Sequence, residues 1–441
     1  MPKAIATTPS WYWPDRVPRV LGTPPYYIEE LLVERWAHRQ PAHPSLVSSD
    51  ARTGAAELAE SVRAVAAALT ALTADTAPDR PVAVSAGPTA EGAVLVLGAL
   101  ASGRKVLLAA PGATIDGMDV SQASLGIGDP AGTAELSAAG LEALRLDALV
   151  ARAPAAAGTP GGDVAEGSDG LAPSVRADGA SGLGAPVACV VGRYGSVWHS
   201  HHSLLAGAVA LGAFLGSGGD TAWLSTYSPC TWEGLCGLTV ALLAGSTMVL
   251  AEPRDAAVEA AAAEHPAWLL SSLADGVATW GGGKRSRRAG GEGVRAALLM
   301  VDGPFDPDER RAVAPAAGGT ALTMFGMAET GVVLASHPSW YLEESVGIPV
   351  PNMHVVAADP DTGQPISSMW ELVDHAMVTA WSPSLAVAGE AAGDGQGPDG
   401  TDGHIGGQTA SGFASRFVGR RFVTGVLAAS DPNGMLYLVD E

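Results

Sequence analysis

Two polar side chains suited to chemistry stand next to each other in TMFGMAETGVV, residues 323–333, where Glu329 and Thr330 interrupt apolar runs. A carboxylate beside a hydroxyl can hold a charged or polar ligand in place. The plain structural interpretation is an ordinary strand, turn and helix. The order of residue types, followed by SVGIPVP at 345–351, favours a functional site instead.

Three histidines, His199, His201 and His202, are candidates for metal binding. Two of them are adjacent, and no carboxylate lies at helical spacing from them, so we do not expect zinc here. The three cysteines form no CxxC pair. Cys230 and Cys236 are more typical of packed apolar cysteines than of nucleophiles.

Two glycine-rich strings could contact phosphates. LGIGDPAG (125–132) has no clear strand before it, which a dinucleotide fingerprint requires, so a loop is the favoured interpretation. GGGKRSRRAGG (281–291) is more typical of a solvated loop than of a phosphate-binding loop. No G-x-S-x-G motif occurs, so the sequence does not support an α/β-hydrolase.

The chain carries 46 acidic and 25 basic residues, a net charge of −21. This balance argues against nucleic-acid binding, which needs clustered Lys and Arg. Three cysteines and an N-terminus without an apolar signal segment fit a cytoplasmic protein. The longest apolar stretch, 235–251, is shorter than the roughly 20 residues that a transmembrane helix needs, so we expect no transmembrane segment.

The elements that must position these residues follow from the apolar pattern. Residues 57–72 place apolar side chains on one helical face, and 81–85, 93–101 and 105–109 read as strand, helix and strand. This alternation is typical of a parallel sheet with helices on its faces.

A second set of elements begins near residue 187. We expect further strands and helices in chain order at 187–191, 203–214, 223–225, 235–251, 268–270 and 296–301. After Gly347 we expect only short strands, at 355–358, 371–373, 377–379, 422–424 and 435–439. Trp223, Trp232 and Met248 are predicted to lie in the core rather than in a ligand pocket.

Several segments carry a resemblance to a known family. WPDRVPRVLGTPPYYIEELLVERWAHRQPAHPSLV (13–47), VWHSHHSLLAGA (197–208), the segment around Glu329, and RRFVTGVLAASDPNGMLYLVDE (420–441) resemble the large N-terminal domain of the adenylate-forming superfamily. This superfamily includes acyl-CoA synthetases, firefly luciferase and peptide-synthetase adenylation domains. The resemblance implies an α/β fold with two α/β layers, mixed sheets and a small distorted β-barrel subdomain.

The resemblance and the composition together predict four regions. They are a first α/β subdomain at 1–110, a low-complexity, partly disordered insert at 111–186, a second α/β subdomain with the AMP-binding motif at 187–346, and a small β subdomain at 347–441. The C-terminal lid domain of the family is expected to be absent.

The resemblance also implies roles for single residues. Glu329 would bind Mg²⁺ and Thr330 would contact the α-phosphate of ATP, which makes both candidate catalytic residues. CoA is a further cofactor that the family implies. The residues implied in binding ATP or AMP are Phe325, which would stack near the adenine, Gly326, Gly192, Arg193, Gly195 and His201.

Three departures from the family predict weak ATP-dependent chemistry. Residues 190–198 stand where the family has a Ser/Thr-rich and Gly-rich phosphate loop ending in Lys-Gly, and they lack its lysine. Val426 replaces the Asp of a Thr-Gly-Asp that binds the ribose, so Val426→Asp should improve AMP binding about tenfold. The lid domain that carries the family's catalytic lysine does not follow Glu441.

We therefore expect an AMP-binding, acyl-CoA-synthetase-like pseudoenzyme of fatty acid metabolism. It would bind an acyl ligand or carboxylic acid, or a protein partner, with weak or no adenylation. The alternative is an active AMP-forming acyl-CoA or acyl-AMP ligase (acid–thiol ligase) with a lid domain supplied in trans. A third alternative is a decayed homologue without function, which the lack of aromatic residues between Ala37 and Arg193 would suit.

Overall fold

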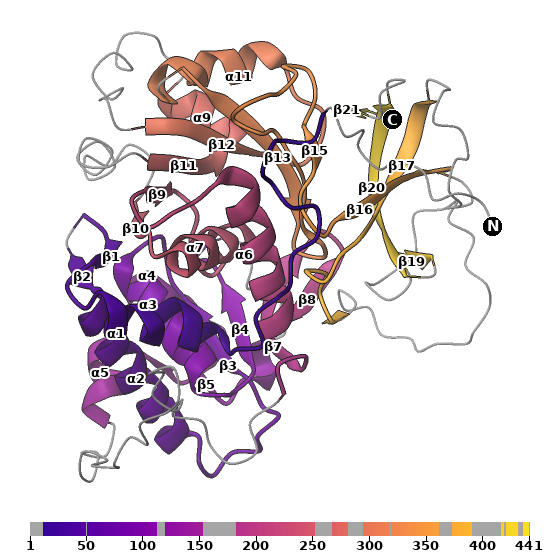
Figure 1. The fold of residues 1–441 in the computed structure, drawn as a ribbon. Helices are drawn as coiled ribbons and strands as arrows, with labels where there is room; N and C mark the ends of the chain where they lie inside the picture. The colour runs from indigo at the N-terminus through magenta and orange to yellow at the C-terminus, as the bar shows by residue number, and fades with distance from the viewer. Residues whose placement is uncertain are drawn as a thin grey trace, which may run out of the picture.

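Two large mixed sheets and a smaller antiparallel sheet form the framework of the computed structural model (Figure 1). The structure describes residues 12–49, 51–112, 120–152, 182–251, 267–280, 294–317, 319–360, 373–389, 416–418, 420–430 and 435–440. Most of the predicted insert after residue 152 lies outside these ranges, as do the basic run 281–291 and residues 390–415.

The largest sheet has nine strands and is parallel at its centre. Strands β9 and β10 are buried along their whole length, which is typical of a sheet with both faces covered. In sheet order its strands are β15 (Ile348–Pro349), β14 (Gly331–Ala335), β13 (Ala321–Met327), β12 (Val294–Val301), β11 (Ala267–Ser272), β9 (Ala222–Ser225), β10 (Thr247–Leu250), β1 (Pro44–Val47) and β2 (Arg52–Gly54).

The second sheet has seven strands, with an antiparallel hairpin beside a parallel core. In sheet order they are β18 (Ala388–Gly389), β8 (Gly195–Ser200), β7 (Pro186–Gly192), β4 (Val106–Ala109), β3 (Val82–Ser85), β5 (Leu125–Gly128) and β6 (Ala143–Leu144). The third sheet is antiparallel and is made by β16 (His354–Ala358), β17 (Val373–Trp381), β20 (Arg421–Ser430), β19 (Phe417–Val418) and β21 (Leu436–Val439).

The helices fill the space between the large sheets and cover their outer faces. Helix α6 contacts β8 and β14, and α7 contacts β7, β9 and β10, so both bridge the two large sheets (Figure 1). Helices α9 and α11 pack on β11 to β13. The helices are α1 (Arg35–Arg39), which a π-helical turn at Glu30–Glu34 precedes, α2 (Ala55–Leu72), α3 (Ala90–Ala101), α4 (Pro130–Ala138), α5 (Leu146–Arg152), α6 (His201–Leu215), α7 (Trp232–Ala244), α9 (Leu273–Trp280) and α11 (Pro307–Val313).

Local sequence explains where the two central helices begin and end. Ser200 caps α6 and forms a capping box with Ser203, while the Thr231 side chain accepts a hydrogen bond from the first turn of α7. Both helices stop at a glycine in the left-handed region, Gly216 with φ 65° and Gly245 with φ 74°.

The strands and helices predicted from the apolar pattern are confirmed within the described residues, with bounds shifted by a few positions. Within the predicted insert, the described residues 120–152 form the regular elements β5, α4, β6 and α5. The interpretation of the glycine-rich string within it is therefore wrong. Residues 125–132 are not a loop, because Leu125–Gly128 form β5 and Asp129 caps α4, which has Pro130 in its first turn. Gly128 and Gly132 pack directly against Ser85, so the close packing of this strand-to-helix turn on β3 accounts for both glycines.

The sheets do not follow the boundaries predicted at residues 110 and 187. Strands β1 and β2 belong to the nine-stranded sheet with β9 to β14, and β7 and β8 belong to the seven-stranded sheet with β3 to β6. Parallel pairing joins segments distant in sequence, and the apolar pattern of a strand does not identify its partner.

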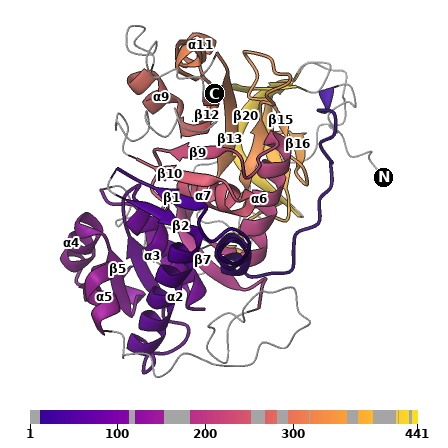
Figure 2. The same cartoon turned by 60° about the vertical axis from the view of Figure 1, so that its left-hand side comes forward.

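The N-terminal segment runs in an extended path along the molecule, from the third sheet to the first helices (Figures 1 and 2). Asn352 holds it at one end, since its side chain accepts from Leu21 N at 2.8 Å and donates to Leu21 O at 2.9 Å. Among the described helices, none has the length and apolarity to cross a membrane.

Candidate functional site

A pocket of about 430 Å³ opens where the carboxyl ends of β12 and β13 face the β7–β8 hairpin. Ligands of open α/β sheets bind at this end of the strands. The residues that line the pocket are Val191, Gly192, Arg193, Trp232, Glu233, Asp302, Phe325, Gly326, Met327 and Ala328.

The parallel pairing of β12 with β13 sets one side of the pocket. Val301 pairs with Phe325, so Asp302, directly after β12, and the end of β13 reach the same edge of the sheet. Helix α7 begins at Trp232, which places Trp232 and Glu233 at the opposite side.

The β7–β8 hairpin closes the third side with a turn of two residues. Gly192 pairs with Gly195, which leaves only Arg193 and Tyr194 between them. Gly195 has φ 110°, a conformation that a side chain would strain. This tight turn stands at the position where the resemblance placed a phosphate loop.

The hairpin rests directly on Glu329. The Tyr194 N–H donates to Glu329 Oε1 at 2.8 Å. A Cβ at Gly192 would lie 2.5 Å from the same oxygen, so only glycine allows this close approach. Hairpin and carboxylate therefore form one packed unit.

Glu329 has no exposed surface, and its Oε2 has no hydrogen-bond partner among the described residues. Burial raises the pKa of this carboxyl, and hydrogen bonds from backbone N–H groups, with the Arg193 charge, partly offset the effect. Glu329 Oε2 could accept a hydrogen bond or bind a cation, but it is buried and no ligand reaches it in this arrangement.

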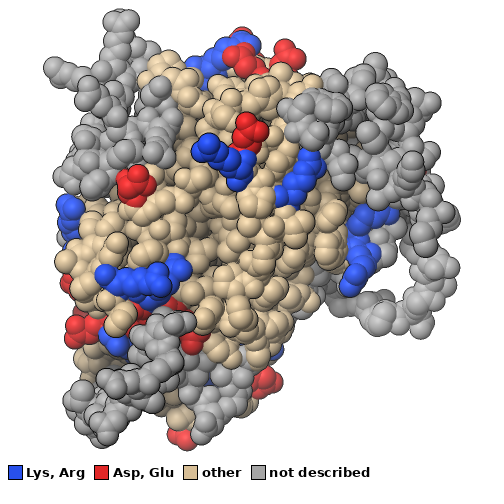
Figure 3. Space-filling view, in the orientation of Figure 1, with Lys and Arg blue, Asp and Glu red and all other residues tan. Residues whose placement is uncertain are grey.

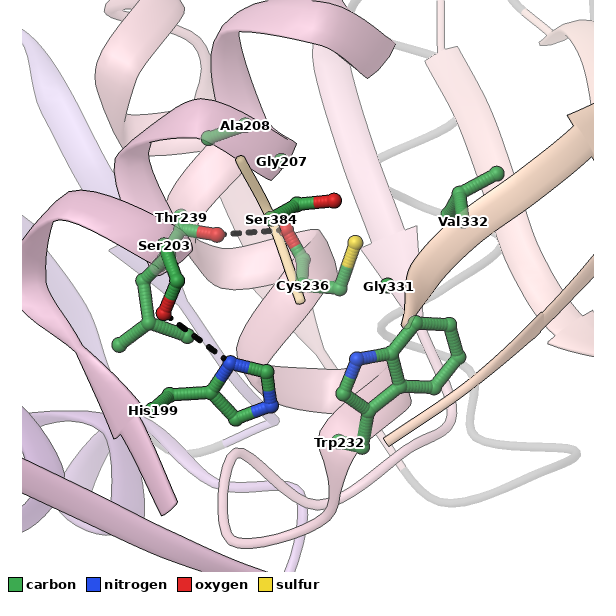
Figure 4. A pocket seen from close by; sticks show the side chains of 11 residues that line it. His199, Ser203, Gly207, Ala208, Trp232, Cys236, Thr239, Gly331, Val332 and Ser384 are labelled. Atoms are coloured by element: carbon green, nitrogen blue, oxygen red, sulfur yellow. Dashed lines mark hydrogen bonds between the residues drawn. The ribbon is translucent and has the colours of Figure 1, made fainter. Parts of the chain in front are cut away.

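The turn that carries Glu329 is held by a buried histidine. His199 Nε2 lies 2.7 Å from Ala328 O, and because a carbonyl only accepts, Nε2 carries the proton. His199 Nδ1 then accepts from Ser203 Oγ at 3.2 Å (Figure 4). Burial lowers the pKa of His199 to about 4, so the ring is neutral at physiological pH.

Behind the pocket lies a second cavity of only about 20 Å³, between α6, α7 and β14 (Figure 4). Trp232, 5 % exposed, lines both spaces and separates them. Trp223 and Met248 lie in the core as predicted, whereas Trp232 also faces the pocket. Burial raises the pKa of the Cys236 thiol to about 12, so this cavity residue is not a nucleophile.

The charged residues of the pocket are mixed in sign. Arg193 is the cation among the described lining residues, and its Nη1 donates to Asp302 O at 3.4 Å. Burial raises the pKa of Glu233, and the nearby Asp302 adds to the effect. Most of the described surface in Figure 3 is uncharged, and the acidic and basic side chains lie in small scattered groups, several of which contain both.

The predicted site residues separate into two groups. Gly192, Arg193, Phe325 and Gly326 line the pocket, whereas Gly195, Thr330, Glu329 and His201 do not. Thr330 is fully buried and donates to Gly331 O at 2.9 Å.

The His201 prediction needs correction. His201 Nδ1 accepts from Ile28 N at 3.3 Å, and its ring meets Tyr27 edge-on at 5.2 Å. This histidine fixes the N-terminal segment on α6 and does not face the pocket. The sequence motif identified the histidine, but it could not show whether the side chain faces the pocket or the N-terminal segment.

Glu233 and Asp302 are lining residues that sequence reasoning missed. The signal for Asp302 was its position directly after the buried strand β12, where ligand sites of parallel sheets occur. Glu233 follows the capping residue Thr231 by two positions, so it projects from the first turn of a helix that begins at the pocket.

Mg²⁺ takes oxygen ligands, commonly one or two carboxylates with substrate phosphates and water. The described residues contain no group of three His, Cys, Asp or Glu side chains placed to share a metal. Glu329 is fully buried under the hairpin, whereas the carboxylates that line the pocket are Glu233 and Asp302. In this arrangement the covered Glu329 does not offer an oxygen to a magnesium ion in the pocket.

Comparison with known proteins agrees with this fold and motif. The family model described as AMP-binding enzyme matches residues 195–369. No curated protein sequence matches the chain significantly.

Solved structures share the fold at low sequence identity. Unliganded O-succinylbenzoate coenzyme A synthetase (MenE) from Bacillus subtilis is 17% identical with a TM-score of 0.71, covering 93% of this chain and 79% of that chain. The same synthetase has been solved with AMP and with ATP and a magnesium ion. A benzoate CoA ligase from Burkholderia xenovorans LB400 is 18% identical with a TM-score of 0.72, covering 94% and 79%.

The structure of VinN has a TM-score of 0.71 and 15% identity, covering 94% of this chain and 99% of that chain. At these identities, structural likeness shows the fold alone. The chain is thus similar to AMP-binding enzymes over residues 195–369, and over most of its length it shares the fold of coenzyme A synthetases and ligases.

Proposed function

We propose that this protein binds an acyl ligand in the pocket and has weak or no ATP-dependent adenylation activity. The observation that carries the proposal is the two-residue hairpin turn that rests on Glu329. A role in cytoplasmic acyl metabolism fits the three free cysteines, Cys189, Cys230 and Cys236.

Weak nucleotide chemistry is supported by what the hairpin offers to a polyphosphate. A phosphate site needs several preorganised N–H donors and a cation. The Tyr194 N–H already donates to Glu329, and Arg193 is the cation at the turn. Loss of each donor lowers the rate by about 10²–10³-fold, so losing several leaves little activity.

Acyl binding is supported by the other walls of the pocket. Trp232, Phe325 and Met327 provide apolar surface, and Arg193 can pair with a carboxylate. The volume of about 430 Å³ suits a small organic ligand. Glu233 and Asp302 disfavour additional negative charge, which again favours a monocarboxylate over a nucleotide triphosphate.

Calorimetry on the full chain tests both parts. MgATP should bind with a dissociation constant in the millimolar range or weaker, about −4 kcal/mol. Octanoate or benzoate should bind more tightly than MgATP, and Arg193→Ala should weaken that binding by about tenfold through loss of a charged hydrogen bond. Arg152→Ala, which removes an exposed arginine paired with Glu142, is the control and should change neither titration.

A low-micromolar constant for MgATP with pyrophosphate release would contradict the proposal. It would support the alternative, an active acyl-CoA or acyl-AMP ligase that uses Glu329, Thr330 and Arg193. The observation that favours this alternative is the Glu329 Oε2 without a partner, since a buried carboxylate oxygen is costly unless something binds it.

A further inference from the structure

We propose that Tyr194 is a specificity-determining residue, which closes the Thr424–Val426 turn and excludes a nucleoside monophosphate while leaving the pocket open to an acyl carboxylate. The inference rests on the proposed function, because it explains which part of a nucleotide the site rejects. Four contacts of the Tyr194 side chain carry it.

The Tyr194 side chain leaves the hairpin on the side of β20. Its hydroxyl donates to Thr424 O at 2.6 Å, a contact between positions 230 residues apart in the chain. Its ring lies 6.2 Å from the ring of Phe422, tilted by 54°. The hairpin of the seven-stranded sheet is therefore fastened to the third sheet by one side chain.

The turn has a glycine at the point of contact. Gly425 has φ 71°, and a Cβ there would lie 1.8 Å from the Tyr194 hydroxyl oxygen. Both the backbone conformation and the space demand glycine at this position. The ring and the turn thus fit each other closely, as two surfaces of a packed interface.

A cation covers the face of the ring. The Arg416 guanidinium carbon lies 3.7 Å from the ring centroid of Tyr194, at the distance of a cation–π contact. Burial raises the pKa of Tyr194, so the hydroxyl stays protonated and remains a donor. Tyr194 is therefore held at its hydroxyl by Thr424 and on its face by Arg416.

The consequence for ligands follows from position. None of Thr424, Gly425 and Val426 lines the pocket. A nucleoside that places its ribose at the 424–426 turn, as the family resemblance implies, needs the space that the Tyr194 hydroxyl occupies against Gly425, and the Val426 side chain offers the ribose no acceptor. A carboxylic acid without a sugar does not need this turn, so its contacts with Arg193, Trp232 and Phe325 are unaffected.

The test is AMP binding to the full chain by calorimetry, with the folded state of each variant checked by thermal denaturation. Tyr194→Ala should bind AMP at least tenfold more tightly than the wild-type chain, and Tyr194→Ser should do the same if the alanine variant does not fold. Val426→Asp alone should improve AMP binding less than threefold, rather than the tenfold expected from the sequence, because the Tyr194 side chain fills the space at the turn. Combined with Tyr194→Ala, Val426→Asp should add about another tenfold.

The matched control is Tyr12→Ala, which removes a tyrosine stacked on Trp340 outside the pocket and should leave AMP binding unchanged. Folded Tyr194 variants that bind AMP no better than the wild-type chain would overturn the inference, as would a tenfold gain from Val426→Asp alone. Tight AMP binding by the wild-type chain would instead overturn the proposed function, so the two failures are distinct.

Discussion

Glu329 and His199 lie on either side of one short turn, and burial determines the behaviour of both. Glu329 is raised in pKa because its charge is removed from water. Burial lowers the pKa of His199, because the charged form of histidine is the protonated one and burial disfavours it. Neutral His199 holds the backbone next to Glu329 in place, because its Nε2 donates to the Ala328 carbonyl.

The buried imidazole predicts how stability changes with pH. The pKa of His199 falls from 6.5 to about 4 in the folded chain, so between these values the unfolded chain binds a proton that the native chain does not. Its stabilising contribution is complete above pH 6.5 and is lost as pH falls toward 4. From pH 6.5 to 5 the loss should be roughly 2 kcal/mol.

Urea denaturation across this range measures the effect. His199→Gln should lower the slope of unfolding free energy against pH, whereas His202→Gln, at an exposed position three residues on, should keep it. Equal slopes in the wild-type chain and His199→Gln would show that another group titrates.

At this scale the sequence predicted residue types better than directions. Phe325, Gly326, Gly192 and Arg193 were found by motif and do line the pocket. The motif could not tell that His201 would point at the N-terminal segment, because both faces of the first turn of α6 carry histidine. It also gave no reason to choose Tyr194, whose side-chain partners Thr424, Phe422 and Arg416 are over 200 residues away.

At the scale of elements, the β7–β8 hairpin decides what the site can do. It replaces an expected phosphate loop with a turn of two residues, and Gly192 allows that turn to touch Glu329. A short turn is stiff, because few backbone torsions are free to move. Its rigidity makes the position of Arg193 well defined for a small carboxylate.

Gly192→Ala tests this packing. The added Cβ would lie 2.5 Å from Glu329 Oε1, and the enclosed carboxylate has no free space to retreat into. We expect a loss of about 1–3 kcal/mol in the free energy of unfolding, typical of overpacking. Gly184→Ala, with nothing within 4 Å of the added atom, should stay within about 0.5 kcal/mol of the wild-type chain.

Neither Gly192 nor Gly184 has a positive φ, so the comparison isolates the steric contact from backbone strain. Equal stability of the two variants would mean that the hairpin is free to lift from Glu329, which would favour the active ligase. The change in denaturation midpoint is sufficient to decide between these outcomes.

Element types were predictable where apolar periodicity was strong, as in α2 and the buried strands β3, β4 and β9. The missed pair β5 and α4 lies in a Gly-rich and Ala-rich stretch, where glycine and alanine give little contrast between faces. Tertiary packing of Gly128 and Gly132 against Ser85 explains their glycines better than a ligand does.

At the scale of the whole molecule, the N-terminal residues are part of structures completed much later in the chain. Leu46 pairs with Met248 in the nine-stranded sheet, and Asn352 holds Leu21 through two side-chain hydrogen bonds. Asn352 has φ 65°, a conformation that asparagine tolerates better than most residues. Subdomains drawn along the sequence therefore do not separate in space.

Two Asn352 variants distinguish the contribution of its left-handed backbone conformation from that of its side-chain hydrogen bonds to Leu21. Asn352→Ala should lose about 1–3 kcal/mol of stability, because it removes both hydrogen bonds and strains the left-handed backbone. Asn352→Gly keeps the backbone conformation and should lose less. Amide hydrogen exchange should show loss of protection at Leu21 in both variants, and retained protection would show that the backbone bond from Asn352 N to Arg19 O holds the segment alone.

The long reach of Asn352 and β1 has a consequence for synthesis on the ribosome. Leu21 emerges 331 residues before its partner. At about 5–20 residues per second, this delay lasts on the order of 15–65 s. During that time the segment around Leu21 lacks Asn352, and until residues 247–250 emerge β1 can pair only with β2. Holdase chaperones that bind nascent chains should therefore engage the first fifty or so residues of this protein.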